Sequence, residues 1–181
     1  MITFVPFPSY EESAKVLDRQ RLCSQRREGC GLLNGITKSR LGTHPGRLPA
    51  MWQMWWYYPE ALAVYVRTID QEWQRRGYQT FKIIPAVALA LEKVGIDKSV
   101  MYKSQTELEH EGLLPAWHNW DAFHRSHRLK LAWKKWEYYE GRFDDVLTVP
   151  ELEPEYIWPT PKKVQEYLKK GLNSSSASYT L

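Results

Sequence analysis

Cysteine is scarce in this chain, and long apolar runs are missing from it. The 181 residues hold 2 cysteines, Cys23 and Cys30, in one expected helix, where they are poorly placed to form a disulfide. No stretch reaches the roughly 18 apolar residues of a membrane helix, and the opening MITFVPFPSYEES lacks the basic-then-apolar order of a signal peptide. We therefore expect a cytoplasmic protein in a reducing compartment.

Alternating apolar and polar residues, which would indicate half-buried strands, do not extend over any useful length. Helical patterns take their place. They open at about residue 10 and cover 49–77, 82–95 and 119–141, with a short amphipathic stretch at 161–172. The expected fold is all-α: a compact single-domain helical bundle of about four main helices with long loops and a short C-terminal helix. Residues 1–160 form the domain, and residues 161–181 add the last helix and a flexible tail.

Glycine and proline set the expected boundaries. Ser9 with Glu12 three residues later predicts a capping box at the start of the first helix. Glycines at 29, 31 and 35 should weaken that helix beyond residue 28. Pro59 either kinks the second helix or starts a new one, and residues 96–118 should be irregular.

Positive charge exceeds negative charge only mildly. Lys and Arg number 25 against 21 Asp and Glu, so the net charge of +4 favours a polyanionic partner weakly. The Gly/Pro-punctuated loop 37–49 carries Arg40, His44 and Arg47, which are candidate phosphate contacts because a loop can approach a nucleic-acid backbone readily. Arg75 and Arg76 beside a glycine either grip a phosphate or neutralise helix carbonyls, and the sequence does not decide between these roles.

The stretch DRQRLCSQRREGC gathers polar side chains on one face of the first helix. Because helical side chains step by about 100°, one arc contains Gln20, Arg21, Ser24, Gln25 and Glu28. Its donors suit phosphate oxygens and base edges. The alternative is a solvated face in which Glu28 pairs with a neighbour such as Arg27, and the spacing alone favours that alternative.

Two further groups have a functional and a structural interpretation. Trp52 and Trp56 could stack on extruded bases, but their helical spacing favours packing. His124 and His127 have the spacing of metal ligands, but no third nitrogen or sulfur ligand accompanies them at a known spacing. We therefore expect no metal.

A resemblance to a known family favours the functional interpretation of the polar arc over the solvated-face alternative. The string QRLCSQRRE resembles the segment that holds the catalytic glutamate in pyrimidine-dimer DNA glycosylases, the endonuclease V type of phages and bacteria, and Glu28 falls on that glutamate. MITFVPFPSYEESAKVLDRQRL resembles the opening of the bacterial branch, and HPGRLPAMWQMWWYYPEAL with EWQRRGY resembles its second helical block. DAFHRSHRLKL and YIWP resemble its closing part, so the resemblance extends over roughly residues 1–160.

The resemblance implies a chemistry. In this family the N-terminal α-amine attacks C1′ of the damaged nucleoside, expels the base and forms an imine, and the glutamate stabilises the cationic sugar and assists strand cutting. Here the amine would be that of Met1, because the bulky Ile2 should hinder removal of the methionine. Gln20 and Arg27 match a glutamine and a basic residue of the pattern, and Arg21 replaces a histidine.

The resemblance thus implies a DNA glycosylase with an AP lyase activity, which would excise pyrimidine dimers or a related damaged or modified base. The resemblance also makes His127 and Arg128 expected phosphate contacts. We expect a monomer that acts on damaged double-stranded DNA without a cofactor or a membrane, near the nucleoid or, for a viral protein, in the host cytoplasm. The alternative is a non-enzymatic nucleic-acid-binding or DNA-processing protein on the same scaffold, and a metal-dependent nuclease built on the two histidines ranks third.

Overall fold

The computed structural model describes residues 3–39, 49–79 and 82–159, and within these ranges it contains helices and no strand, as the sequence predicts. The elements are α1 (Tyr10–Val16), α2 (Arg19–Ser39), α3 (Ala50–Trp55), α4 (Pro59–Arg75), α5 (Ile83–Glu92), the 3-10 helix η2 (Lys98–Tyr102), α6 (Gln105–His110), α7 (Asp121–Lys134) and α8 (Trp136–Tyr139). In this part of the chain no helix is both long and apolar enough to span a membrane. The helix expected at 161–172 lies outside the described residues.

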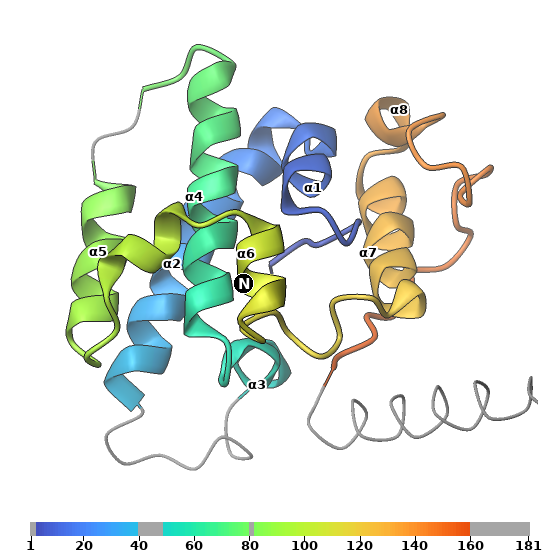
Figure 1. Cartoon of the computed structure of the whole chain (residues 1–181). Helices are drawn as coiled ribbons and strands as arrows, with labels where there is room; N and C mark the ends of the chain where they lie inside the picture. Colours follow the sequence, from blue (N-terminus) through green and yellow to red (C-terminus); the bar gives the residue numbers. More distant parts are fainter. Residues whose placement is uncertain (1–2, 40–48, 80–81, 160–181) are drawn as a thin grey trace, which may run out of the picture.

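Helix α4 is the centre of the fold. It packs against α1, α2, α5 and η2, and from Pro59 to Val66 it is buried except at Glu60. Figure 1 shows α2, α4 and α5 on one side and α7 with α8 on the other. The dark-blue N-terminal segment runs between these two groups before it enters α1 (Figure 1). Both groups bind this segment: α2 and α4 hydrogen-bond to Phe4, and α7 hydrogen-bonds to Val5.

The first expected helix is in fact two helices, and its glycines do not end it. The chain leaves the helical conformation at Leu17, and α2 then continues through all three glycines to Ser39. A Cβ atom on Gly29 would lie 2.6 Å from Cγ2 of Val66 in α4, and one on Gly35 would lie 2.1 Å from the Trp52 ring. These two glycines allow close packing of α2, which outweighs their low helix propensity.

Other boundaries follow the sequence in part. The Ser9 hydroxyl accepts the Glu12 N–H at 3.2 Å and caps α1, and Pro59 occupies the first turn of a new helix rather than a kink. The prediction of an irregular 96–118 is wrong, because η2 and α6 lie there. Helix α6 begins with a capping box between Ser104 and Glu107, but at 6 residues it is too short to show a periodic pattern.

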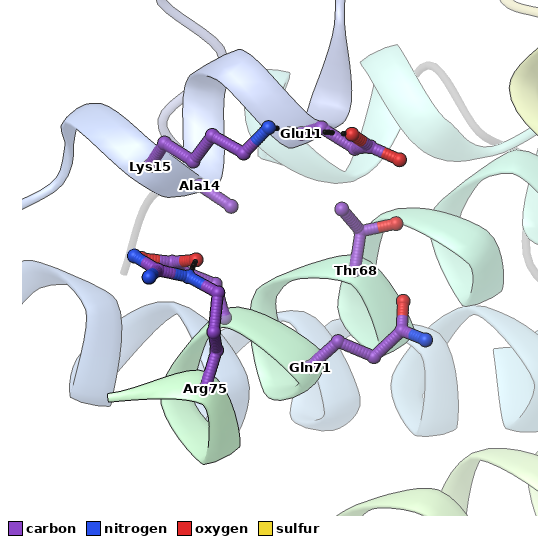
Figure 2. Close-up of a pocket in the computed structure, with 7 residues that line it drawn as sticks. Glu11, Ala14, Lys15, Thr68, Gln71 and Arg75 are labelled. Atoms are coloured by element: carbon purple, nitrogen blue, oxygen red, sulfur yellow. Dashed lines mark hydrogen bonds and ion pairs between the residues drawn. The ribbon is translucent and has the colours of Figure 1, made fainter. Parts of the chain in front are cut away.

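Arg75 and Arg76 have structural roles, and Arg75 lines a hollow between α1 and α4 (Figure 2). Both bind the buried carboxylate of Glu72, at 2.6 Å in each case. Arg76 also donates to the carbonyl oxygens of Lys15 and Leu17, at 2.8 Å each, where α1 ends and no further helical turn supplies a donor. Arg76 therefore neutralises helix carbonyls, and both guanidinium groups are already engaged by Glu72.

Candidate active site

The polar arc of α2 faces an open cavity of about 400 Å³. All five side chains that helical spacing assigns to the arc line this cavity, which confirms the predicted arc. The complete lining is Phe4, Gln20, Arg21, Ser24, Gln25, Glu28, Lys130, Lys134, Glu153, Tyr156 and Trp158. Glu28 is partly buried and lies in the wall of this cavity.

The start of α2 is fixed by Asp18. One carboxylate oxygen of Asp18 accepts the N–H groups of Gln20 and Arg21 at 2.9 and 3.2 Å, and the other accepts the hydroxyl of Tyr139 at 2.8 Å. Asp18 also pairs with the Arg21 guanidinium at 3.2 Å. Because Asp18 and Tyr139 are buried, this network holds the first turn of α2, and with it Gln20 and Arg21, at the cavity.

The N-terminal segment forms another wall. Phe4 is 4% exposed and lines the cavity, and its N–H donates to Oε1 of Gln25 at 2.8 Å. The adjacent Thr3 is fully buried and accepts the indole N–H of Trp55 at 2.8 Å. Met1 lies outside the described residues, and Phe4 is three positions after it in the sequence.

The described segment after α8, residues 140–159, forms a further wall of the cavity, and we call it the arm. The ammonium of Lys130 binds Glu153 and the carbonyl oxygen of Pro154, and the Ile157 N–H donates to Ser126 at 3.1 Å. These bonds dock the arm on α7 and bring Tyr156 and Trp158 to the cavity, with ring centroids 5.4 Å apart. Neither aromatic residue was among the predicted site residues, and the closely spaced pair in YIWP was the available signal.

Two phenols near Glu28 stay neutral. Burial raises the pKa of Tyr156, and the negative charges of Glu153 and Glu28 raise it further, while Arg21 lowers it. Burial also raises the pKa of Tyr65, with smaller contributions from Tyr10 and Glu28. These phenols can donate hydrogen bonds at neutral pH, but they are not bases there.

A basic groove adjoins the cavity and shares Gln20 and Ser24 with it. Its other lining residues are Arg19, Cys23, Arg27, Trp73 and Lys135. Arg27, a predicted DNA contact, is exposed there. The predicted contacts Arg40, His44 and Arg47 lie outside the described residues.

The predicted phosphate contacts at His127 and Arg128 need correction. His127 is fully buried, and its Nδ1 accepts the Val5 N–H at 3.2 Å. Arg128 is 7% exposed and already binds Asp121, Asp145 and the Pro6 carbonyl oxygen at 2.8 to 3.0 Å. Both side chains hold the fold together and do not face solvent, where DNA phosphates would lie.

Two alternatives remain: a metal site that includes His124, and base stacking by Trp52 and Trp56. The ring nitrogens of His124 lie 2.8 and 2.6 Å from the carbonyl oxygens of Val5 and His118, so backbone groups occupy the positions of a metal ion. Trp56 is 6% exposed and belongs to the core, and Trp52 packs partly buried against it. The packing interpretation of these tryptophans is confirmed. Cys23 and Cys30 are both free, as predicted.

The site is thus a carboxylate among cationic and amide side chains on a helical scaffold. The family model described as pyrimidine dimer DNA glycosylase matches residues 1–83. This match confirms the family resemblance for the segment that contains Glu28 and the whole polar arc. No curated protein and no solved structure matches the chain significantly.

Proposed function

We propose that the protein is a DNA repair glycosylase with an associated AP lyase activity, which excises pyrimidine dimers or a related damaged base from double-stranded DNA. One observation carries the proposal. Glu28 shares an open, cation-lined cavity with Phe4, which is three residues from Met1. A chain spans at most about 3.3 to 3.6 Å per residue, so the free amine is within about 11 Å of Phe4.

The proposed nucleophile is the α-amine of Met1. An α-amine has an ordinary pKa of about 7.7 to 8.0, so a useful fraction is neutral near pH 7. Its lone pair forms a bond to C1′ of the damaged nucleotide, and the glycosidic bond breaks with its electron pair on the departing base. Opening of the sugar ring then gives an imine, β-elimination breaks the C3′–O bond, and water releases the amine.

Glu28 is the proposed catalytic acid–base group. Its carboxylate can stabilise the cationic sugar as the base departs, and it can accept and return the protons of imine formation and elimination. The cavity places cations and amides around it, but the negative charge of Glu28 is the feature that opposes the developing positive charge.

DNA contacts are proposed on both sides of Glu28. Gln20 and Arg21 can reach the nucleotide in the cavity, and Arg27 can bind a backbone phosphate in the basic groove. Lys134 and Lys135, which the sequence analysis did not select, are exposed at the cavity and the groove respectively. The loop residues Arg40, His44 and Arg47 stay in the proposal as phosphate contacts.

Borohydride trapping tests the function. An imine between protein and a damaged or abasic duplex becomes a stable covalent adduct on reduction, and a non-enzymatic DNA-binding protein gives none. The adduct should disappear when extra residues precede Met1 or when the α-amine is acetylated, whereas a C-terminal tag should leave it intact. An adduct that persists with a blocked amine would move the nucleophile to a lysine side chain and refute the role of Met1.

A further inference from the structure

The N-terminal segment is held by side chains and not by a neighbouring strand. In an extended segment the backbone N–H and C=O groups normally pair with a strand, and none is present in the described ranges. Phe4 instead donates to Gln25 of α2 at 2.8 Å and accepts the hydroxyl of Tyr65 of α4 at 2.8 Å. Val5 donates to His127 of α7 at 3.2 Å.

These bonds fix the segment in one register. Gln25 and His127 are 1% and 0% exposed, and Phe4 and Val5 are equally enclosed, so water cannot replace the bonds readily. A buried N–H that loses its acceptor also loses the water it could bind when unfolded, so a slip of the segment by one residue is disfavoured. The acceptor on His127 is permanent near neutral pH, because burial lowers its pKa to about 3 and keeps the ring unprotonated.

Gln25 connects this register to the catalytic acid. Gln25 and Glu28 are three residues apart on α2, so their side chains are neighbours on one helix face, and both line the cavity. The hydroxyl of Tyr65, 3.0 Å from Oε1 of Gln25, links Gln25 to α4 as well. The same rigid helix thus carries the acid and the acceptor that holds Phe4.

We propose that Gln25, supported by Tyr65 and His127, is a positioning residue that holds the N-terminal segment in the register that delivers the free amine to Glu28. This inference rests on the proposed function, because it assumes that the amine is the nucleophile. It adds residues that act through the N-terminal segment and not on the substrate. A misplacement of about 1 Å at a reacting group can cost about a hundredfold in rate, so loss of this register should be visible in the chemistry.

The test compares Gln25→Leu, which has no acceptor, with Gln25→Glu, which keeps an oxygen at the same place. The substrate is an abasic-site duplex, on which trapping needs only an amine and an aldehyde. Gln25→Leu should lower the single-turnover trapping rate at least tenfold, while affinity for a duplex with a reduced abasic site stays within about twofold. Gln25→Glu should recover most of the rate.

Tyr58→Phe is the matched control. Its hydroxyl accepts the Ala116 N–H at 3.2 Å, so the variant also loses one bond to the backbone, but no residue of the cavity is involved. Trapping by Tyr58→Phe should equal the wild-type rate. Hydrogen exchange at the Phe4 amide should accelerate in Gln25→Leu and not in the control, which separates release of the segment from general loosening.

The outcomes distinguish two failures. If the wild-type protein forms no adduct, the proposed function fails. If the wild-type protein traps and Gln25→Leu traps equally fast although its Phe4 amide exchanges freely, the positioning role is refuted and the function stands. Should Gln25→Leu not fold, Tyr65→Phe replaces it, because this near-isosteric change removes only the hydroxyl that holds Phe4; an unchanged trapping rate in that variant would equally refute the role.

Discussion

The glycines of α2 allow a stability prediction with an internal control. A methyl group on Gly29 would lie 2.6 Å from Cγ2 of Val66, a buried and β-branched residue that has little freedom to rotate away. The same methyl group on Gly31 would meet nothing within 4 Å. Both positions lie inside α2, so both variants gain about the same helix propensity, roughly 0.5 to 1 kcal/mol.

The difference between Gly29→Ala and Gly31→Ala is therefore the steric cost at the contact with α4. Overpacking of this kind costs about 1 to 3 kcal/mol. Gly31→Ala should raise the midpoint of thermal unfolding slightly, and Gly29→Ala should lie below it by roughly 2 to 12 °C, since about 1 kcal/mol shifts the midpoint by about 2 to 4 °C in a chain of this size. Urea denaturation with an unchanged slope would confirm that stability alone has changed.

The pair also has a functional readout. Gly29 follows Glu28 directly, so a displacement of α2 from α4 would move the carboxylate, whereas Gly31→Ala leaves the contact intact. At a temperature where both variants are folded, strand cutting should fall in Gly29→Ala only. Equal stability of the two variants would show that α2 and α4 are not in tight contact at this position, and the argument for close packing would fail.

Three other predictions concern Glu28, the basic groove and the buried His127. Glu28→Gln should lower strand cutting by about a hundredfold or more, because the charge opposite the cationic sugar is lost, while duplex binding persists; cutting at the wild-type rate would return Glu28 to an ion-pair role. Neutralising Arg27 or Lys135 should in each case lower the slope of log binding constant against log salt concentration, for duplex DNA, by about 0.9. The control is Lys93→Gln, at an exposed residue just after α5. An unchanged slope would show that Arg27 and Lys135 do not contact DNA. Burial lowers the pKa of His127 from 6.5 to about 3, so between these two pH values only the unfolded chain binds this proton. This group should therefore make the free energy of unfolding fall by about 1.4 kcal/mol for each pH unit below 6.5. Urea titrations at pH 7.5 and 5.5 measure this, and equal stability would contradict it.

The part of the site that the sequence predicts is the part with a helical period. The arc from Gln20 to Glu28 follows from the 100° step alone, and the cavity confirms all of its members. Phe4 and Tyr156 lie in segments without a period, and their place depends on bonds to residues far along the chain, such as Gln25 and Lys130. Sequence spacing does not predict which distant residues such segments contact.

The wrong predictions have a common physical origin. The glycines of α2 were interpreted by local propensity, but Gly29 and Gly35 serve contacts with Val66 and Trp52 that only the folded structure contains. Similarly, the family resemblance implied a phosphate contact for Arg128, whose partners Asp121 and Asp145 hold it inside. Propensity and charge patterns describe a helix by itself, and tertiary contacts decide which of its faces reaches solvent.

Helix α2 connects the two groups of the proposed chemistry, the acid Glu28 and the N-terminal amine. An acid and an N-terminal amine come from unrelated parts of the chain, so their separation would vary with every loop motion unless one rigid element controlled both. Helix α2 provides Glu28 directly and binds Phe4 through Gln25, one turn away, while Gly29 packs the same turn against α4. In the proposed mechanism one helical turn therefore holds both the acid and the segment that leads to the amine, so changes at Gln25 and at Gly29 should both affect the chemistry more than DNA binding.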